Sequence, residues 1–474
     1  MRLIVGSIIG FLLSGAAGAG APPSATSRPN ILFIMTDDQA PWALAAAGDP
    51  NAVTPQMDRL RSEGVLLTAC YTPTPVCSPS RASILTSRYG TEVGITDYLG
   101  KSEDKLSLTV PTWPRLLAQA GYATGLIGKY HCGNTAETHP TKIGYGEFSG
   151  FLMAGETSRN PKVERNGVSQ QMEGWTEDIL AGLAIEFIRN HVAGPFALSL
   201  HFWAPHAQEY KNSDGDRTWL PLSDEDWNAV KEINLRLPEP DYPDLDAKRN
   251  LRMLREYLGS VHSADRNIGK VLAVLDELNL RNNTVVIFTS DNGYNLGHHG
   301  VWHKGNGLWL LQNDRSVRSN LWDNSLRVPA IVRWPGMVPA GSTVDEQISF
   351  LDWFPTLVAI AGARAPEGAV LRGHDVRLVL QGKARAEESG FFGQYKMRGG
   401  SDMRSYQTKQ WKLVRYLDRS QPDEFYDRQA DPAERHNLSR STDKRIRGAL
   451  EELNARLVES MKSIDDPSIG LVSK

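Results

Sequence analysis

Three short and largely apolar runs constrain the fold of this chain more than any other feature. They cover residues 30–36, 196–202 and 284–290. Such runs are typical of parallel strands that are buried on both faces of a sheet. Polar residues follow each run within a few positions. We therefore expect three buried strands whose carboxyl ends lead into polar segments.

Helical patterns lie between these runs. They cover residues 54–63, 112–120, 176–191 and 251–278, and the last has apolar residues at a spacing near 3.6. Strands that alternate with helices predict an α/β fold with a large, mainly parallel central sheet flanked by helices. Because ligands of such sheets bind beyond the carboxyl ends of the strands, the polar segments there are candidates for a functional site.

The pattern changes after about residue 375. Hairpin-like strands are predicted at 391–395 and 409–414, a turn at 423–427 and a helix at 442–461. A chain of 474 residues is long enough for one large and one smaller folding unit. We expect the α/β domain at 30–375 and a smaller C-terminal antiparallel α+β subdomain at 376–474.

The N-terminal segment has the pattern of an export signal. Arg2 precedes an apolar stretch at 3–13, and small residues at 17–21 offer cleavage sites. The alternative, a membrane anchor, needs about 20 apolar residues. We expect a signal peptide at 1–21, a linker at 22–29, and a periplasmic or secreted protein without a stable membrane span.

The overall charge excludes one class of partner. The formal net charge is −3 and the isoelectric point is near 6.4. Because such a chain presents no broad basic field, we expect no nucleic-acid partner. An anionic substrate would have to be bound by a local cluster of cations.

The chain has three cysteines, Cys70, Cys77 and Cys132. So few cysteines exclude a disulfide-rich scaffold. If Cys77 has a chemical role, Cys70 and Cys132 remain as a possible pair, or both serve as small buried residues. The sequence leaves both alternatives open.

Acidic and amide side chains follow two of the predicted strands. Asp37 and Asp38 end the first strand, and Asp291 and Asn292 end the third. If the two strands are neighbours, three carboxylates and an amide meet at one edge of the sheet. Oxygen ligands of this kind suit Ca²⁺ or Mg²⁺. The alternative, that these residues only cap strands and form turns, is weakened by their occurrence at two matching places.

A thiol opens the helical pattern at 77–88. Cys77 would lie at the N-terminus of a helix, where backbone N–H groups favour an anion. The pattern Cys77-x-Pro79-Ser80-Arg81 resembles the modification signature of type I sulfatases, in which the cysteine becomes formylglycine. An ordinary thiol is the alternative interpretation.

The resemblance extends over most of the chain, and so the chain is identified as similar to the formylglycine sulfatases of the alkaline phosphatase superfamily. It includes Pro29-Asn30-Ile31 with Asp37-Asp38, Gly121 to Thr124, Gly128 to His131, Pro205-His206, Ser290 to Gly293, Leu296 to Gly300, Lys304 and Ser325 to Pro329. It implies one Ca²⁺ held by Asp37, Asp38, Cys77 as formylglycine, Asp291 and Asn292. It also implies catalytic roles at the sulfate for Cys77, Arg81, Lys129, His131, His206 and Lys304, and a formylglycine-generating maturation enzyme as a partner.

The implied reaction is hydrolysis of a sulfate ester, with a sulfated carbohydrate expected as the substrate and a small sulfate ester as the alternative. One hydroxyl of the hydrated formylglycine attacks sulfur, and His206 or Lys304 protonates the leaving alkoxide. His131 would accept the proton of the second hydroxyl, which releases sulfate. His299 would support the metal edge or its loop, and His298 has no assigned role.

Specificity should lie outside the sulfate pocket, in the loops at 208–242, 302–320 and 396–404. Two of these depart from the family pattern: Ala207-Gln208-Glu209 follows His206, and an inserted stretch follows Lys304. Three cations, Lys396, Arg398 and Arg404, either contact a uronate or second sulfate or are surface charges.

Two alternatives to a sulfatase remain. A phosphodiesterase or phosphonate monoester hydrolase can use the same nucleophile and similar metal ligands. An inactive protein that binds sulfated glycans is the other alternative, although the complete nucleophile signature argues against it.

Overall fold

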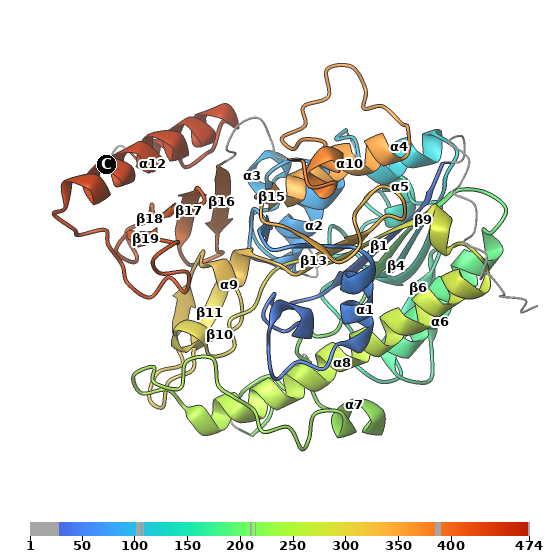
Figure 1. The fold of residues 1–474 in the computed structure, drawn as a ribbon, viewed down its shortest axis with the longest axis horizontal. Helices are drawn as coiled ribbons and strands as arrows, with labels where there is room; N and C mark the ends of the chain where they lie inside the picture. The colour runs from blue at the N-terminus through green and yellow to red at the C-terminus, as the bar shows by residue number, and fades with distance from the viewer. Residues whose placement is uncertain are drawn as a thin grey trace, which may run out of the picture.

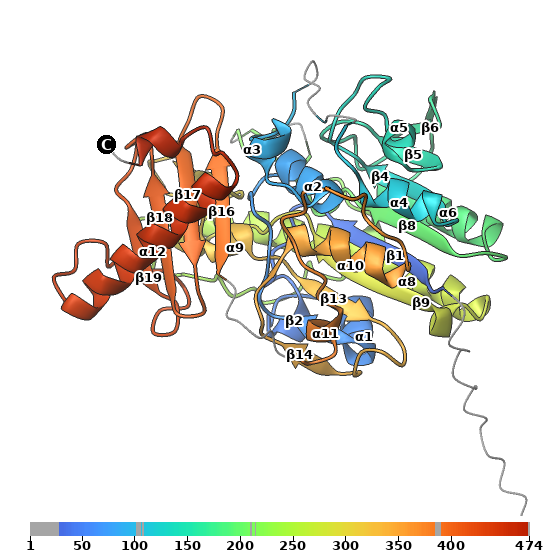
Figure 2. The same ribbon diagram turned by 90° about the horizontal axis from the view of Figure 1, so that it is seen from above.

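The computed structural model describes residues 28–100, 106, 109–208, 211–213, 215–383 and 390–472. The predicted signal peptide and all but the last two residues of the linker lie outside this range. Within it, the chain forms a large α/β unit and a smaller unit at the C-terminus, which lie side by side in both views (Figures 1 and 2).

A ten-stranded sheet forms the centre of the larger unit. Its five middle strands, in the order β9-β1-β8-β4-β5, are all parallel, and the strands at both edges add antiparallel pairs. The middle strands are β1 Asn30–Thr36, β4 Ala123–Lys129, β5 Glu147–Phe151, β8 Phe196–His201 and β9 Thr284–Ser290. The outer strands are β2 Val65–Leu67, β13 Ala330–Arg333, β14 Ser342–Val344, β6 Lys162–Arg165 and β7 Val168–Gln171.

Helices cover both faces of this sheet, which explains why the central strands β1, β8 and β9 are mainly apolar and buried throughout. Phe33 of β1 packs in the core with α2, α4 and α10, whereas Leu32 packs on the opposite face with α1, α6 and α8. These helices are α2 Cys77–Thr86, α4 Trp113–Gln119, α10 Trp353–Ile360, α1 Pro55–Glu63, α6 Thr176–Asn190 and α8 Ala247–Glu277. The predicted α/β fold with a mainly parallel sheet is confirmed.

Shorter elements fill the connections of the larger unit. The helices among them are α3 Gly90–Val93, α5 Pro140–Ile143, α7 Asp224–Asn228, α9 Asp323–Leu326 and α11 Arg377–Leu380. Two strands, β3 Cys70–Tyr71 and β15 Ile348–Ser349, pair with each other. Three more, β10 Val301–Trp302, β11 Asn306–Trp309 and β12 Val317–Ser319, form a small antiparallel sheet. The stretch inserted after Lys304 is therefore partly a hairpin.

The C-terminal unit is an antiparallel sheet with one long helix. The strands are β16 Phe391–Lys396, β17 Asp402–Gln407, β18 Trp411–Tyr416 and β19 Glu424–Asp427, and the helix is α12 Lys444–Ser463. The turn predicted at 423–427 is wrong, because Glu424–Asp427 pairs with β18 as an edge strand. Leu453 and Leu457 of α12 pack on Phe425 and Leu413 of this sheet.

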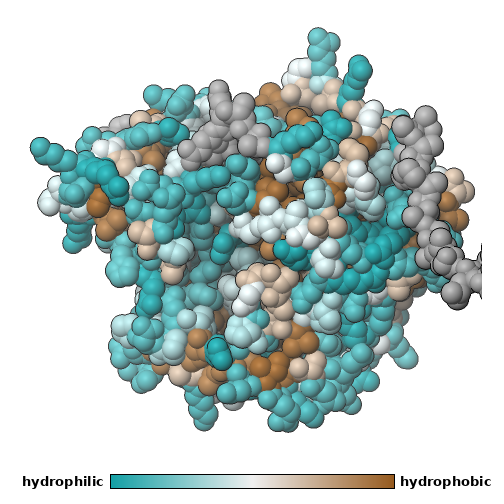
Figure 3. Space-filling view, in the orientation of Figure 1, coloured by the Kyte–Doolittle hydropathy of each residue, from teal (hydrophilic) through white to brown (hydrophobic). Residues whose placement is uncertain are grey.

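Cys70 and Cys132 are buried free thiols, so they do not form a disulfide here. Among the described residues, no helix is long and apolar enough to cross a membrane. The face in Figure 3 is mainly hydrophilic, with hydrophobic residues in scattered groups.

Candidate active site

The pairing of β1 with β9 creates an acidic cluster at the carboxyl edge of the sheet. Thr36 lies in register with Ser290, and the N–H of Asp291 donates to the carbonyl of Thr36 at 3.0 Å. The next residues of both strands therefore meet. The N–H of Asp38 donates to the Asp291 carboxylate at 3.1 Å, and oxygens of Asp37, Asp38 and Asp291 lie within 4.8 Å of one another. All three carboxylates are buried.

This cluster has the features of a site for a hard cation. Asn292 donates from Nδ2 to the carboxylate of Asp38 at 2.8 Å and to the carbonyl of Gly293 at 2.9 Å. Its Oδ1 is buried and has no hydrogen-bond partner among the described residues. A buried amide oxygen without a hydrogen bond, beside three carboxylates, would destabilise the folded protein unless a cation bound there. The residues therefore fit Ca²⁺ or Mg²⁺.

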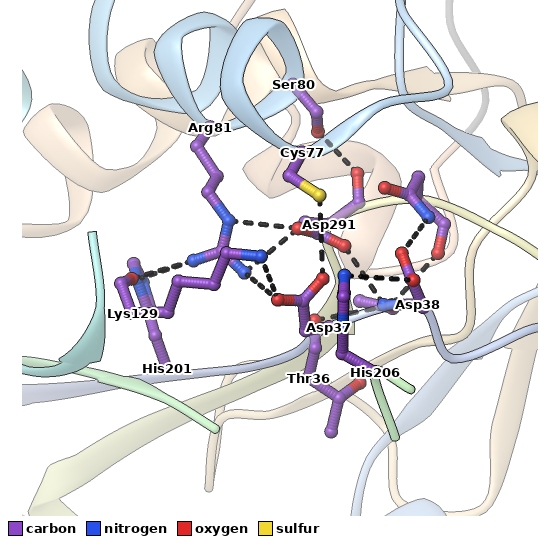
Figure 4. Close-up of polar contacts among 12 residues, drawn as sticks. Thr36, Asp37, Asp38, Cys77, Ser80, Arg81, Lys129, His201, His206 and Asp291 are labelled. Atoms are coloured by element: carbon purple, nitrogen blue, oxygen red, sulfur yellow. Dashed lines mark hydrogen bonds and ion pairs between the residues drawn. The ribbon is translucent and has the colours of Figure 1, made fainter. Parts of the chain in front are cut away.

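Cys77 is the first residue of α2 and points toward the acidic cluster (Figure 4). Its Sγ accepts from Nζ of Lys304 at 2.9 Å and lies 3.7 Å from Oδ1 of Asp37. Burial raises the pKa of the thiol to about 12, against the opposing effect of Lys129 and Lys304. An unmodified thiol at this position is therefore protonated at neutral pH and is a poor nucleophile.

Arg81 and Lys129 neutralise part of the acidic cluster. Nε of Arg81 donates to the Asp291 carboxylate at 2.9 Å, and Nη1 donates to the carbonyl of Lys129 at 2.7 Å. Lys129 forms an ion pair with Asp37. Burial, the largest single influence, lowers the pKa of Lys129, but Asp37, Cys77 and Asp291 together reverse it and the net pKa is raised. Burial and Asp37 raise the pKa of Asp291, although Arg81 opposes them.

Lys304 and His206 approach the same cluster from the other side. Lys304 forms an ion pair with Asp38, and Nε2 of His206 lies 3.8 Å from Asp38. Burial raises the pKa of Asp38, but Lys304 and His206 reverse the effect and the net pKa is lowered. Asp38 therefore stays ionised and available to a cation.

His131 is placed as a proton acceptor. Its Nε2 lies 3.1 Å from the carbonyl of Leu99, which can only accept, so Nε2 carries the proton in the neutral ring. Nδ1 has no hydrogen-bond partner among the described residues. Burial and Lys129 lower the pKa of His131 well below its ordinary value. The ring is therefore neutral with Nδ1 as the basic atom.

A cavity of about 160 Å³ opens over these groups. Four of the predicted site residues line it: Cys77, His131, His206 and Lys304. Its other lining residues are Val76, Tyr98, Ala154, Arg217, His303 and Asn306. Arg217, His303 and Asn306 lie in the segments 208–242 and 302–320 that were predicted to shape specificity, whereas Val76, Tyr98 and Ala154 were not predicted.

Other predicted residues lie apart from this cavity. His299 stacks on Trp322 with ring centroids 4.1 Å apart, and His298 packs against Trp42 at 5.3 Å, so His299 belongs to the loop rather than to the acidic cluster. Arg404 is fully buried between Asp402 and Asp466. Both interpretations of Arg404, a contact with a substrate anion and a surface charge, are therefore wrong.

Comparison with known proteins assigns a class to this fold and site. The sulfatase family model matches residues 29–363, and the model for the C-terminal part of N-sulphoglucosamine sulphohydrolase matches residues 317–463. The chain is therefore a sulfuric ester hydrolase. It belongs to the type I sulfatase family, which has the alkaline-phosphatase-like fold.

Several relatives cover most of the chain. N-acetylglucosamine-6-O-sulfatase of Bacteroides thetaiotaomicron is 26% identical over 90% of this chain and 85% of its own length. Steryl-sulfatase of Rattus norvegicus is 30% identical over 82% of this chain and 75% of its own. The structure of BT4656 in complex with its substrate D-glucosamine-2-N,6-O-disulfate superposes with a TM-score of 0.78 at 24% identity, covering 93% and 99% of the two chains.

Proposed function

We propose that this sulfatase hydrolyses a sulfate ester on a sulfated carbohydrate, with formylglycine formed from Cys77 as the nucleophile and one bound Ca²⁺. The observation that carries the proposal is the position of Cys77. Its side chain lies at the N-terminus of α2, in contact with Lys304 and with Asp37 of the acidic cluster, and lines the cavity. Burial raises the pKa of this thiol, which supports conversion to another nucleophile there.

The carbohydrate substrate is supported by relatives rather than by the sulfate pocket itself. N-acetylglucosamine-6-O-sulfatase and N-acetylgalactosamine-6-sulfatase are among the proteins to which the chain is similar. Steryl-sulfatase is another such relative, so an apolar alcohol is the competing substrate class. The polar groups of the cavity, Arg217, His303 and Asn306, favour a sugar because they can bind hydroxyls or anions.

The residues that would hold Ca²⁺ are Asp37, Asp38, Asp291, Asn292 and the modified residue 77. When bound there, the cation supplies charge that favours deprotonation of a hydroxyl and that stabilises the negative transferring group. The orphaned Oδ1 of Asn292 supports this assignment from the chain itself.

Each of the other residues has a role that its position supports. The aldehyde hydrate offers one hydroxyl to attack sulfur and a second to release sulfate. Arg81 and Lys129 hold Asp37 and Asp291 and place positive charge beneath the ester. His206 or Lys304 protonates the leaving oxygen, and Nδ1 of His131 takes the proton of the second hydroxyl.

The signal pattern at 1–21 leads us to propose export, with maturation by a formylglycine-generating enzyme.

The test is sulfate release from a panel of sulfated mono- and disaccharides and a steroid sulfate, in the presence of Ca²⁺. The protein used should have its conversion at residue 77 verified by mass spectrometry. Release from a sugar supports the proposal. Faster hydrolysis of phosphate diesters than of every sulfate ester would support the alternative phosphodiesterase, and no turnover of any ester by converted protein would support the inactive binding protein.

A further inference from the structure

The backbone carbonyl of Lys129 joins three elements of the site. It accepts from Nη1 of Arg81 at 2.7 Å and lies 3.0 Å from Nδ1 of His201 (Figure 4). Because a carbonyl can only accept, Nδ1 of His201 carries the proton and donates the hydrogen bond. Side chains from α2 and β8 therefore meet on one backbone oxygen at the end of β4.

The ring of His201 is held in place by its surroundings. His201 is the last residue of β8, where it pairs with Gly128 of β4, and its side chain is buried. Its ring centroid lies 6.5 Å from that of Phe33, with an angle of 68° between the planes. Burial and the nearby Arg81 lower the pKa of His201 to about 3, so the ring is neutral near pH 7. The N–H donor at Nδ1 is therefore present throughout the neutral pH range.

Arg81 depends on the Lys129 carbonyl for one part of its guanidinium. Its Nε and Nη2 each lie 2.9 Å from the Asp291 carboxylate, so Nη1 is the nitrogen that the carbonyl holds. Nη1 lies 3.5 Å from Nδ1 of His201, but both atoms are donors and therefore share the carbonyl rather than bond to each other. A shift of this carbonyl would turn the guanidinium and move its charge.

Lys129 itself depends on the same peptide group. Its side chain forms an ion pair with Asp37, and its carbonyl is the one that His201 holds. The preceding residue, Gly128, leaves no room for a Cβ against the carbonyl of His201, so β4 and β8 are tightly packed at this point. His201 is not among the described residues that line the catalytic cavity. It can therefore act on the reaction only through Arg81 and Lys129.

We propose that His201 is a positioning residue for sulfate transfer. Its Nδ1–H holds the Lys129 carbonyl, and this carbonyl in turn orients the guanidinium of Arg81 and the end of β4 that carries Lys129. The proposal rests on the proposed function, in which these two cations place positive charge beneath the ester. Because such charges act mainly on the transition state, an error in their position should lower the rate more than it weakens substrate binding.

The test compares two variants of nearly equal shape. His201→Asn keeps an N–H donor near the position of Nδ1, whereas His201→Leu has none. On one sulfated sugar, His201→Leu should lower kcat at least about 10-fold and change KM less than about 3-fold. His201→Asn should recover most of this loss in kcat. Conversion at residue 77 is verified by mass spectrometry for each protein, and rates are compared per converted molecule.

Tyr122→Phe is the matched structural control. It removes the hydrogen bond that the Tyr122 hydroxyl donates to the carbonyl of Pro29 at 3.0 Å. This bond lies at the amino ends of β4 and β1, opposite to the catalytic edge of the sheet. The variant should lower the midpoint of urea unfolding and leave kcat unchanged, which separates a loss of stability from a loss of position.

Equal kcat in wild type and His201→Leu, or equal losses in His201→Leu and His201→Asn, would overturn the proposal. A rise in KM without a fall in kcat would overturn it as well. If His201→Leu does not fold, His201→Gln takes its place, because its amide lies one bond farther out than Nδ1 and it should also lower kcat. Failure of wild-type converted protein on every sulfated sugar would instead count against the proposed function.

Discussion

Asp291 lies at the centre of the electrostatics of the site. It accepts hydrogen bonds from Arg81 and from the N–H of Asp38, and burial and Asp37 raise its pKa. A cation bound among these carboxylates would relieve their mutual repulsion. Calcium should therefore stabilise the folded protein as well as support turnover.

Asp291→Asn should weaken calcium binding and lower activity by about 100-fold or more, as for loss of other preorganised electrostatic contacts. With calcium at about 100 times its Kd, the wild type should gain about 2.7 kcal/mol in the free energy of unfolding. Asp291→Asn should gain much less, whereas the exposed control Asp345→Asn should behave like the wild type. Denaturation with and without calcium measures this, and an equal gain in all three proteins would contradict the calcium site.

Glu177 supports the turn that carries His206. Its Oε1 accepts from the N–H of Ala204 at 2.9 Å, and its Oε2 has no hydrogen-bond partner among the described residues. Burial raises the pKa of this carboxyl from 4.5 to about 8. Because the native state holds the proton longer than the unfolded state, its contribution to stability is full below pH 4.5 and is lost as the pH rises to about 8.

Glu177→Gln mimics the protonated carboxyl and should remove this pH dependence. The free energy of unfolding of the variant relative to wild type should be roughly 2 kcal/mol more favourable at pH 8 than at pH 6. Urea denaturation at the two pH values measures the difference, with the exposed Glu225→Gln as the control. Parallel pH profiles for wild type and Glu177→Gln would show that the carboxyl is ionised in the native protein.

The elements explain which parts of the fold could be predicted. Runs at 30–36 and 284–290 match β1 and β9 because both strands are buried on two faces and contain apolar residues throughout. Strand β4 was not predicted from the sequence, because Gly125 and Gly128 interrupt its apolar pattern. The segment 423–427 was predicted as a turn because acidic residues and a preceding proline are typical of turns, whereas pairing with β18 makes it a strand.

Gly128 is required where β4 passes β8. Its φ is +101°, and a Cβ there would lie 1.8 Å from the carbonyl oxygen of His201. Gly128→Ala should therefore separate the strands and cost at least about 2 kcal/mol in stability. Because Lys129 follows directly, activity should fall as well.

Gly167→Ala is the matched control, since Gly167 also has a positive φ of +94° but a Cβ there meets nothing within 4 Å. It should cost about 1 kcal/mol and leave activity unchanged. Thermal or urea denaturation compares the two variants. Similar losses of stability in both variants would mean that the close approach of β4 to β8 is not the reason why position 128 requires glycine.

At the scale of the whole molecule, the two units are joined by a buried ionic cluster at their contact. Nζ of Lys412 in β18 lies 2.9 Å from Asp323 of α9 and 2.8 Å from Glu434, and Asp323 also pairs with Arg428 at 2.8 Å. The N–H of Asp323 donates to Glu434 at 2.8 Å. These contacts fix the C-terminal sheet against the segment that follows the small sheet β10–β12.

Lys412→Ala should leave buried carboxylates unpaired and destabilise the protein by about 3–5 kcal/mol. Lys409→Ala removes a lysine that is 40% exposed and should cost less than about 1 kcal/mol. Equilibrium unfolding compares the two variants. A small effect of Lys412→Ala would mean that apolar packing alone holds the C-terminal unit in place.

Some residues of the candidate site could be predicted from the sequence and others could not, for a physical reason. Residues at strand ends and in the Cys77 signature have positions that parallel pairing and helix geometry fix, so the structure brings them together as the sequence suggests. Arg217 and His303 lie in loops that were predicted to shape specificity, but which of their side chains line the cavity depends on tertiary contacts, and no local pattern marks Tyr98. The individual residues of the outer cavity therefore emerge only from the structure.

The most direct test of residue 77 as the nucleophile measures sulfate release against the degree of conversion at that residue. Preparations with different converted fractions, determined by mass spectrometry, are assayed on one sulfated sugar with saturating Ca²⁺, beside Cys77→Ala. If residue 77 is the nucleophile, the rate is proportional to the converted fraction, and Cys77→Ala releases no sulfate above background. Turnover that is independent of conversion, or that persists in Cys77→Ala, would contradict the role of residue 77 as the nucleophile.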